Sequence, residues 1–337
     1  MGEWSVRVRR RGNIATPELW TRSARSLMQV TNYKAFWDDK ASTTIGALLA
    51  VDGSASEDVA RLTGAYTARQ VASALDFAPT DHVLELGCGV GRIGLQLAPK
   101  VARWDGADIS ANMLEVARTR LAAQNNVGFT ELKRSRLDGL ADASFDKAYS
   151  VAVFIHMDKE DFFLYLEELA RVLKPGGLLY FDTWNLASKV GWRRFMLEVE
   201  QHRHADPSQR KDVARNQFST PEEVRTFLDH AGFEPLLIMG DSPWVQAVAL
   251  KPGGGADAAM LRANLKSRAA RIAYTPLWTE LFDRVIAVAH AGAPPATLLE
   301  GLGDDSRGEE IAMFRTWYLD LWRHNQEHWG PPPDIAR

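Results

Sequence analysis

The sequence has a single cysteine and no long apolar run. With only Cys88 among 337 residues, the chain cannot form an intramolecular disulfide or a cysteine-rich metal site. No apolar stretch approaches the roughly 18 residues of a membrane-spanning helix, and the N-terminus lacks the apolar core of a secretory signal. We therefore expect a cytoplasmic protein that does not associate with membranes.

The sequence also lacks an excess of charge of either sign. A net charge of -3 gives the chain no general attraction to nucleic acids or anionic membranes. The basic run Arg7–Arg11 is typical of a solvated terminus. Basic and aromatic residues do not interleave over any long stretch, so a nucleic-acid partner is not expected. With 46% hydrophobic residues, the composition predicts a globular protein with a full core.

Strand and helix signals alternate through the middle of the chain. Short apolar runs typical of buried parallel strands occur in HVLEL, RWDGADI, FDKAYSVAVF and GLLYFDTW, with helical stretches between them. Two later runs, FEPLLIMGD and WVQAVALK, predict an antiparallel pair. The alternation predicts an α/β fold with a doubly wound, mostly parallel sheet.

The segments around this alternation differ from it in character. We expect residues 1–60 to form an N-terminal helical cap, residues 61–252 the α/β domain, and residues 253–337 a helical C-terminal extension. Within the domain, residues 186–218 are predicted to form a polar lid. Its excess of Lys and Arg would face an anionic substrate or form a solvated helix surface.

Two helix boundaries follow from local patterns. Ser54 and Glu57 have the spacing of a capping box, which predicts a helix start there and a helix that runs to about Leu75. The apolar face of KEDFFLYLEELARVL predicts a second helix. The KPGG sequence that includes Pro175 is expected to end it.

The turn VLELGCGVGRIG, residues 83–94, can be read in two registers. From Gly89 it spells the G-x-G-x-x-G of a dinucleotide-binding loop, and from Glu85 it spells E-x-G-x-G-x-G. The apolar strand ends at Leu86, two residues too early for the dinucleotide register. A carboxylate at Glu85 would repel a pyrophosphate and attract a cationic ligand, unless backbone donors satisfy it in the core. We favour the second register, in which Gly94 packs a helix.

Several blocks of the sequence, in order, resemble the class I S-adenosylmethionine-dependent methyltransferases. They are VLELGCGVGRIG, GADISANML, LADASFDKAYSVAVFIHM and RVLKPGGLLYF, followed by an AGF that leads into the final strand pair. The resemblance covers roughly residues 61–252 and implies a Rossmann-like sheet of seven strands. It also implies an enzyme that uses S-adenosylmethionine, releases S-adenosylhomocysteine, and methylates O or N of a small molecule, which we expect to be a specialised metabolite.

The resemblance further implies which residues hold the methyl donor. The glycines of the turn would admit the methionine part, Asp108 would bind the ribose hydroxyls, and Ile109 and Met113 would flank the adenine. Leu137 or Ser135 would lie at the adenine edge, where the sequence departs from the family by carrying basic residues. The implied cofactor-binding residues are Glu85, Gly87, Cys88, Gly89, Gly91, Asp108, Ile109, Met113, Leu137, Ser150, Val151, Tyr66 and Arg69.

Other side chains are candidates for the reaction itself. His156 follows the fourth strand, and a neutral imidazole there could deprotonate the acceptor near pH 7; the alternative is that it caps or packs the next helix. Arg69 could pair with the donor's carboxylate or be solvated. Ligands of open α/β sheets bind at the carboxyl ends of the strands. The substrate-pocket candidates at the end of the fifth strand are Tyr180, Asp182, Trp184 and Asn185.

The C-terminal segment is rich in aromatic residues. One helical side carries Phe314, Trp317, Leu321 and Trp322. This pattern predicts core packing or a homodimer contact through the helical extensions, and an aromatic wall for a planar substrate is the alternative. No metal site is expected, because the pairs His202 with His204 and His324 with His328 lack a third ligand at a suitable spacing.

Three other functions stay open at this point. The chain could use the same donor for different chemistry, such as intramolecular displacement. It could instead be a nicotinamide-dependent oxidoreductase, since the turn contains that pattern. A non-catalytic binding module that contacts a partner through its C-terminal helices is the third alternative.

Overall fold

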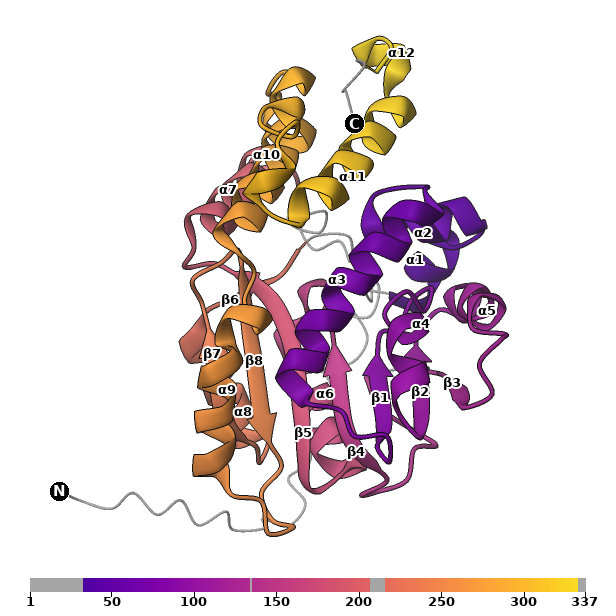
Figure 1. Cartoon of the computed structure of the whole chain (residues 1–337), viewed down its shortest axis with the longest axis vertical. Helices are drawn as coiled ribbons and strands as arrows, with labels where there is room; N and C mark the ends of the chain where they lie inside the picture. Colours follow the sequence, from indigo (N-terminus) through magenta and orange to yellow (C-terminus); the bar gives the residue numbers. More distant parts are fainter. Residues whose placement is uncertain (1–32, 134, 207–215, 333–337) are drawn as a thin grey trace, which may run out of the picture.

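The computed structural model describes residues 33–133, 135–206 and 216–332. These residues form one twisted sheet with helices on both faces and a further group of helices at one end (Figure 1). The basic run near the N-terminus and part of the expected lid lie outside the described residues. Within the described ranges, no helix is both long and apolar enough to cross a membrane.

The sheet has the strand order β3-β2-β1-β4-β5-β8-β7. Neighbours from β3 to β5 pair in parallel, and β8 pairs antiparallel with both β5 and β7. The strands are β1 (His82–Leu86), β2 (Arg103–Asp108), β3 (Val127–Glu131), β4 (Phe145–Ser150), β5 (Leu173–Asn185), β6 (Phe218–Ser219), β7 (Glu234–Met239) and β8 (Trp244–Leu250). The expected mostly parallel sheet and its final antiparallel pair are confirmed. The short β6, which pairs with β5 beside the seven-strand path, is an addition.

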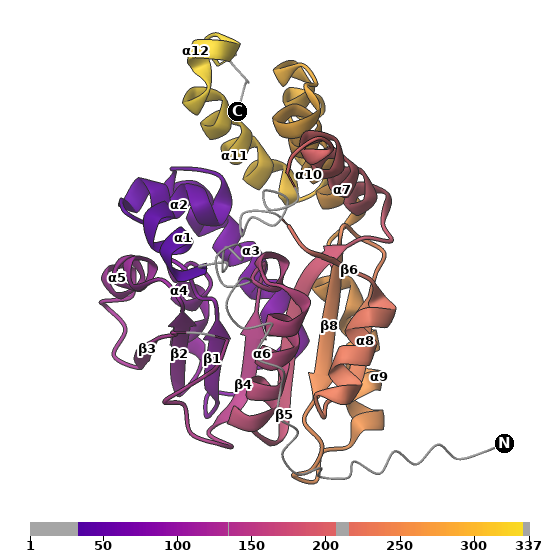
Figure 2. The ribbon, with the colours of Figure 1, turned by 180° about the vertical axis from the view of Figure 1, so that it is seen from behind.

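Helices cover both faces because each presents apolar side chains to the sheet. Buried residues of α3, α4, α5 and α9 join the core on one face, and those of α6 and α8 join the core on the other. Figure 2 shows α6 and α8 in front of the sheet. The helices are α1 (Tyr33–Lys40), α2 (Thr44–Asp52), α3 (Glu57–Leu75), α4 (Gly94–Leu97), α5 (Ala111–Arg120), α6 (Lys159–Val172), α7 (Lys189–His202), α8 (Pro221–His230), α9 (Ala258–Ile272), α10 (Pro276–Ala291), α11 (Glu310–His324) and α12 (Gln326–Trp329).

The C-terminal helices occupy two different places. Leu265 and Ile272 of α9 are buried in the core between the sheet and α3. By contrast, α10 and α11 lie with α7 beyond the carboxyl ends of the parallel strands (Figure 1). There they share a separate core with Trp184 and Trp244 from the strand ends. The segment after residue 253 therefore gives one helix to the sheet and places two at the end where ligands of such sheets bind.

One predicted helix start is wrong by two residues. The N-cap of α3 is Ser56, whose hydroxyl accepts a hydrogen bond from the Val59 N–H. Ser54 instead donates its hydroxyl to Asp320 of α11 at 2.5 Å. The capping-box pattern predicted the wrong N-cap because the Ser54 hydroxyl takes part in a tertiary contact. The predicted end of α3 at Leu75 is confirmed.

Candidate active site

A cavity of about 430 Å³ opens at the carboxyl ends of the parallel strands. Its volume is typical of small-molecule sites in proteins. The strand order reverses between β1 and β4, the position where doubly wound sheets bind ligands. The glycine turn, α2 and the end of β2 contribute lining residues, as do the ends of β5 and β8 together with α10 and α11.

The glycine turn joins β1 to α4 at this cavity. The N–H groups of Gly87 and Cys88 both donate to the Ala107 carbonyl of β2, at 2.7 and 3.1 Å. Gly87 has a φ of +71°, and a Cβ there would lie 2.2 Å from a methyl group of Val153. Glycine is therefore required at position 87 by the backbone conformation and by a protein side chain. Gly89, which was predicted to contact the donor, also lines the cavity.

Two glycines farther along the turn face the protein. A Cβ at Gly91 would lie 2.6 Å from Leu121 at the end of α5, and one at Gly94 would lie 2.3 Å from the Trp104 ring. The predicted packing role of Gly94 is confirmed. Gly91 does not line the cavity, so the donor contact expected of it is not supported. Its position is explained by close packing between the turn and α5.

Glu85 places a carboxylate in the lining from inside β1. It is 3% exposed and accepts a hydrogen bond from the Tyr149 hydroxyl at 2.6 Å. That hydroxyl accepts one from the Trp104 indole N–H at 2.9 Å. Burial raises the pKa of Glu85 to about 8, although the Tyr149 hydrogen bond opposes the shift. A cationic ligand in the cavity would offset this desolvation.

Asp108 ends β2 and is fixed by backbone donors. Its two carboxylate oxygens accept hydrogen bonds from the N–H groups of Gly89 and Ser110, at 2.8 and 2.9 Å. Burial raises the pKa of Asp108, and these hydrogen bonds oppose the shift. Ile109 and Met113 line the cavity beside it. The structure thus brings together the three residues that were predicted to surround the adenosine part of the donor.

Arg92 lies in the cavity, and Arg69 does not. The Arg92 Nε is 3.3 Å from the Asp52 carboxylate, and the two side chains are 12% and 6% exposed. A further Arg92 N–H donates to Thr67. Arg69 instead pairs with Glu309 at 2.8 Å, at the edge of a second cleft. Its predicted contact with the donor is not supported. Arg92 was missed, although it belongs to the glycine turn itself.

His156 lines the cavity next to Trp37. The two rings meet edge to face, with centroids 4.8 Å apart. The His156 Nδ1 is buried and has no hydrogen-bond partner within the described residues. Burial lowers the pKa of His156 to about 4, so the imidazole is neutral near pH 7. It does not cap the following helix, because Asp158 occupies the N-cap position of α6.

Aromatic side chains from the strand ends and the C-terminal helices also line the cavity. We define the aromatic wall as Trp184, Trp244, Tyr274, Trp278, Phe282 and Trp317. The rings of Trp184 and Trp244 stack with centroids 4.7 Å apart, and those of Trp278 and Phe282 stack at 4.6 Å. Trp184 was predicted and Trp317 belonged to an alternative reading. Trp244, Tyr274, Trp278 and Phe282 were missed, although Trp278 and Phe282 are four residues apart on α10 and therefore lie on one helical side.

Three predicted residues support the fold and do not line the cavity. The Tyr180 hydroxyl accepts a hydrogen bond from a buried glutamine of β8 at 2.8 Å. Ser150 donates to a backbone carbonyl of β1 at 3.1 Å. The Asn185 amide donates to two backbone carbonyls of the turn before β8. Their predicted ligand contacts are not supported, because these polar groups serve the sheet and its turns.

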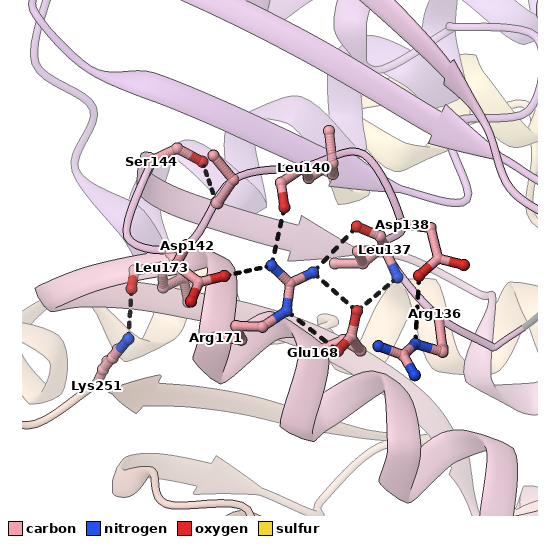
Figure 3. A network of polar contacts seen from close by, with 11 residues as sticks. Arg136, Leu137, Asp138, Leu140, Asp142, Ser144, Glu168, Arg171, Leu173 and Lys251 are labelled. Carbon is pink, nitrogen blue, oxygen red and sulfur yellow. Dashed lines mark hydrogen bonds and ion pairs between the residues drawn. The ribbon is translucent and has the colours of Figure 1, made fainter.

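Leu137, expected at the adenine edge, is buried in the core. Its N–H donates to Glu168 at 2.8 Å and its carbonyl accepts from Arg171 at 3.0 Å (Figure 3). The Arg171 guanidinium also bonds Glu168 and lowers the pKa of that carboxyl group. This network fixes the loop before β4 with Leu137 turned into the core. Ser135, the alternative, does line the cavity.

Asp182 lies behind the cavity lining and connects two parts of it. Its carboxylate accepts hydrogen bonds from the Ala152 N–H at 2.6 Å and from the Tyr274 hydroxyl at 3.2 Å. Ala152 has a φ of +57°, which a non-glycine residue holds only when its surroundings enforce it. Burial raises the pKa of Asp182 to about 6. Since both partners line the cavity, Asp182 is a positioning residue and not the substrate contact that was expected.

Three further residues that were predicted to bind the donor lie in the cavity lining. Tyr66, Cys88 and Val151 line the cavity. Burial raises the pKa of the Cys88 thiol, so this group is not suited to nucleophilic chemistry. Among the described residues, no cluster of three or more potential metal ligands occurs.

Two arginines in the described part of the expected lid are paired with carboxylates. Arg193 of α7 pairs with Asp283 of α10, and Arg194 pairs with Glu198 at 3.0 Å. Arg210, Lys211 and Arg215 lie outside the described residues. The described arginine pairs therefore do not support an anionic acceptor.

Comparison with known proteins adds evidence from outside the chain. Residues 83–177 match the family model described as a methyltransferase domain. The methyltransferase GfsG of Streptomyces halstedii is 38% identical over 120 residues, which cover 34% of this chain and 42% of that protein. The O-methyltransferase cnsE of Penicillium expansum is 34% identical over 127 residues, covering 36% and 45%. The chain thus spans less than half the length of these curated relatives.

Among solved structures, the magnesium protoporphyrin IX methyltransferase of Synechocystis with bound SAH is 19% identical, with a TM-score of 0.44. The match covers 58% of this chain and 84% of that one. The strand order, the glycine turn and the cavity define an open α/β domain that binds its ligand at the switch point of the sheet. Together with the family model and the relatives, they identify residues 83–177 as a methyltransferase domain within this fold.

Proposed function

We propose that this chain transfers a methyl group from S-adenosylmethionine to a hydroxyl oxygen of a small, uncharged molecule, of the kind known as specialised metabolites. One observation carries the proposal: charged and aromatic residues share a single cavity. Three carboxylates line it, those of Asp52, Glu85 and Asp108, against the one guanidinium of Arg92 among the described residues. This excess of acidic groups suits a ligand with a sulfonium and an ammonium group, because such a ligand favours their ionised forms.

The charged residues have the chemistry that such a donor requires. The buried Glu85 carboxylate would bind the ammonium group, since a cation offsets its desolvation. Asp108, already oriented by two backbone N–H groups, would accept hydrogen bonds from the ribose hydroxyls. Arg92, held by Asp52, would pair with the donor's carboxylate. A dinucleotide fits less well, because its pyrophosphate would meet the Glu85 carboxylate.

His156 would act on the acceptor. The donor supplies an electrophilic methyl carbon bonded to a positively charged sulfur. The imidazole of His156, which lines the cavity, would take the hydroxyl proton as the oxygen bonds to the methyl carbon. The carbon–sulfur bond breaks in the same step, and its electron pair stays on the sulfur. The aromatic wall would hold the acceptor in line and exclude water.

Oxygen is the favoured target for two reasons. The relative from Penicillium expansum is named an O-methyltransferase, and the cavity is lined by an imidazole that can take a hydroxyl proton. Product analysis tests the reaction. S-adenosylhomocysteine together with a methylated hydroxyl supports the proposal. Methylthioadenosine without S-adenosylhomocysteine indicates intramolecular displacement and contradicts it.

Donor binding is tested by Glu85→Gln, which keeps the shape of the side chain and removes its charge. We expect the affinity for S-adenosylhomocysteine to fall about a hundredfold in calorimetry, because a buried charge on the ligand loses its partner. The matched control is Glu115→Gln, whose side chain is 78% exposed, and it should leave the affinity unchanged. Unchanged binding by the Glu85 variant, or stabilisation of the protein by NADH alone, would contradict the proposal.

A further inference from the structure

The end of α2 packs against the glycine turn at the charged part of the cavity. Asp52 lies 3.3 Å from the Arg92 Nε, and a Cβ at Gly89 would lie 3.2 Å from a methyl group of Val51. Both segments line the cavity, α2 and its C-cap through Ala50, Val51, Asp52 and Gly53. A donor that pairs with Arg92 would fill the space that the two segments enclose, and would restrict the motion of both.

Ser54 connects this segment to the C-terminal helices. Ser54 is 2% exposed, and its hydroxyl donates to the Asp320 carboxylate of α11 at 2.5 Å. The same hydroxyl oxygen accepts a hydrogen bond from the Ser56 N–H at 3.1 Å, which helps to orient it. A hydrogen bond to a carboxylate is stronger than one between two neutral groups. The buried bond begins two residues after Asp52, which pairs with Arg92.

The other end of this hydrogen bond lies on the helix that carries part of the aromatic wall. Met313, Trp317 and Asp320 follow one another at spacings of four and three residues, so they share one side of α11. Met313 and Trp317 line the cavity. The bond from Ser54 therefore reaches α11 one turn away from a residue of the aromatic wall.

Other polar contacts of α11 show the contrast. Arg315 and Tyr318 of this helix donate to backbone carbonyls within the C-terminal extension itself. Arg69 of α3 pairs with Glu309, the residue before α11, but these side chains are 53% and 68% exposed and lie at the second cleft. The bond from Ser54 differs from these contacts, because it joins α11 to the segment that packs on the glycine turn.

We propose that Ser54 and Asp320 are positioning residues that couple the two parts of the cavity. A bound donor holds the end of α2 on the glycine turn, and the Ser54–Asp320 hydrogen bond transmits this order to α11 and its share of the aromatic wall. The acceptor then binds more tightly after the donor than before it, and strengthens donor binding by the same factor. This inference rests on the proposed function, whose order of binding it names.

The test is hydrogen–deuterium exchange of the full chain, followed by mass spectrometry of the peptides that cover α2 and α11. The probe is S-adenosylhomocysteine, at a concentration that calorimetry shows to saturate each protein. The measured quantity is the slowing factor of each helix, which is its exchange rate without the probe divided by its rate with the probe.

Two variants break the hydrogen bond, and two serve as controls. Ser54→Ala removes the donor hydroxyl and Asp320→Ala removes the accepting carboxylate, whereas Asp320→Asn keeps an oxygen that can accept the bond. Arg69→Gln is the matched control, because it breaks the exposed contact at the start of α11.

We expect the probe to slow exchange in both helices of the wild-type chain, by about fivefold or more in α11, as is typical of coupled sites. Ser54→Ala and Asp320→Ala should keep the slowing factor of α2 and reduce that of α11 to about one. Their double variant should behave like either single variant, since both remove the same bond. Asp320→Asn and Arg69→Gln should keep the wild-type factors.

Three results would overturn the inference. The first is a slowing factor of α11 that is about one in the wild-type chain. The second is an equal α11 factor in the wild type and in Ser54→Ala, even if the variant exchanges faster in both states, because the bond then only stabilises the helix. The third is a loss of slowing in α2 as well as α11 in Ser54→Ala with the probe bound, because Ser54 would then support the donor site itself.

The proposed function fails in a different way. If S-adenosylhomocysteine does not bind the wild-type chain, calorimetry shows no binding and exchange slows in neither helix, which contradicts both proposals. If it binds and slows exchange in α2 but not in α11, only the coupling through Ser54 and Asp320 is contradicted.

Discussion

The charged and the aromatic residues of the cavity are assembled in different ways. Glu85, Arg92 and Asp108 come from one continuous stretch, β1 to the end of β2, and Asp52 joins them from α2. The aromatic wall combines residues between Trp184 and Trp317 from two strands, two helices and the segment that precedes α10. The first group carries formal charges held by hydrogen bonds and ion pairs, and the second carries stacked rings without charge.

The difference reflects two kinds of recognition. A few charged atoms at fixed positions can select a cationic donor, and a strand followed by a tight turn fixes such positions locally. Recognition of a flat apolar molecule requires large surfaces on several sides. Such surfaces arise only when distant segments pack together. Under the proposed function, a short motif would therefore carry the donor site, whereas the acceptor site would depend on the whole tertiary structure.

The largest effect is expected at His156, which belongs to neither group. His156→Asn should lower kcat by about a hundredfold to ten-thousandfold, because it removes the general base. The affinity for S-adenosylhomocysteine should stay within about twofold, since the charged residues are untouched. The measurements are single-turnover methyl transfer to the acceptor found by product analysis, and calorimetry. If kcat is unchanged, or if donor affinity falls in parallel with it, His156 is a packing residue against Trp37.

A smaller effect is expected at Arg92. Arg92→Gln should weaken S-adenosylhomocysteine binding about tenfold to hundredfold, as expected for lost hydrogen bonds between charged groups. A second substitution, Asp52→Asn, is combined with Arg92→Gln so that no unpaired carboxylate is left at this position.

Arg69→Gln is the control for this prediction. Its side chain is 53% exposed and pairs with Glu309, and surface ion pairs contribute at most about 1 kcal/mol. It should leave the affinity unchanged. If Arg69→Gln weakens S-adenosylhomocysteine binding more than Arg92→Gln does, the donor's carboxylate pairs with Arg69, as the sequence predicted.

Most of the fold could be predicted from the sequence because it depends on local patterns. Buried strands such as β1 and β8 are short apolar runs, and their alternation with helices determines a doubly wound sheet. The start of α3 could not be predicted, because Ser54 bonds Asp320, which is 266 residues away. The edge strand β3 has no fully buried residue and gives no apolar run.

The same difference between local patterns and contacts of distant residues applies to the candidate site. Glu85, Asp108 and Ile109 were found because a short motif places them. Ser150 and Asn185 were expected in the lining because strand ends face the site, but the sequence does not show which polar groups the sheet itself uses. The wall was mostly missed because its members meet only after α10 and α11 fold over the strand ends.

The pH dependence of donor binding is the mildest expected effect. Burial raises the pKa of Glu85 to about 8 in the ligand-free protein, so this group is mostly protonated at neutral pH. An ammonium group binds the carboxylate form, and binding therefore releases a proton. The affinity for S-adenosylhomocysteine should rise about tenfold between pH 6 and pH 7, the limit for one proton. Calorimetry in buffers of different ionisation enthalpy measures both the affinity and the proton released.

Glu85→Gln is the control, because it removes the titrating group and should leave the residual affinity almost flat over this range. Asp182, whose pKa burial raises to about 6, titrates in both proteins, so its effect cancels in the comparison.

The raised pKa of Glu85 also affects the stability of the protein. A raised pKa in the folded state stabilises the ligand-free protein at low pH, and this stability is lost as the pH rises to about 8. Bound donor should restore it only in the wild-type chain, because only there does the donor's charge face a carboxylate. If the affinity for S-adenosylhomocysteine does not depend on pH in either protein, Glu85 does not bind the donor's ammonium group. The difference between the charged residues and the aromatic wall would then reflect only how the protein folds.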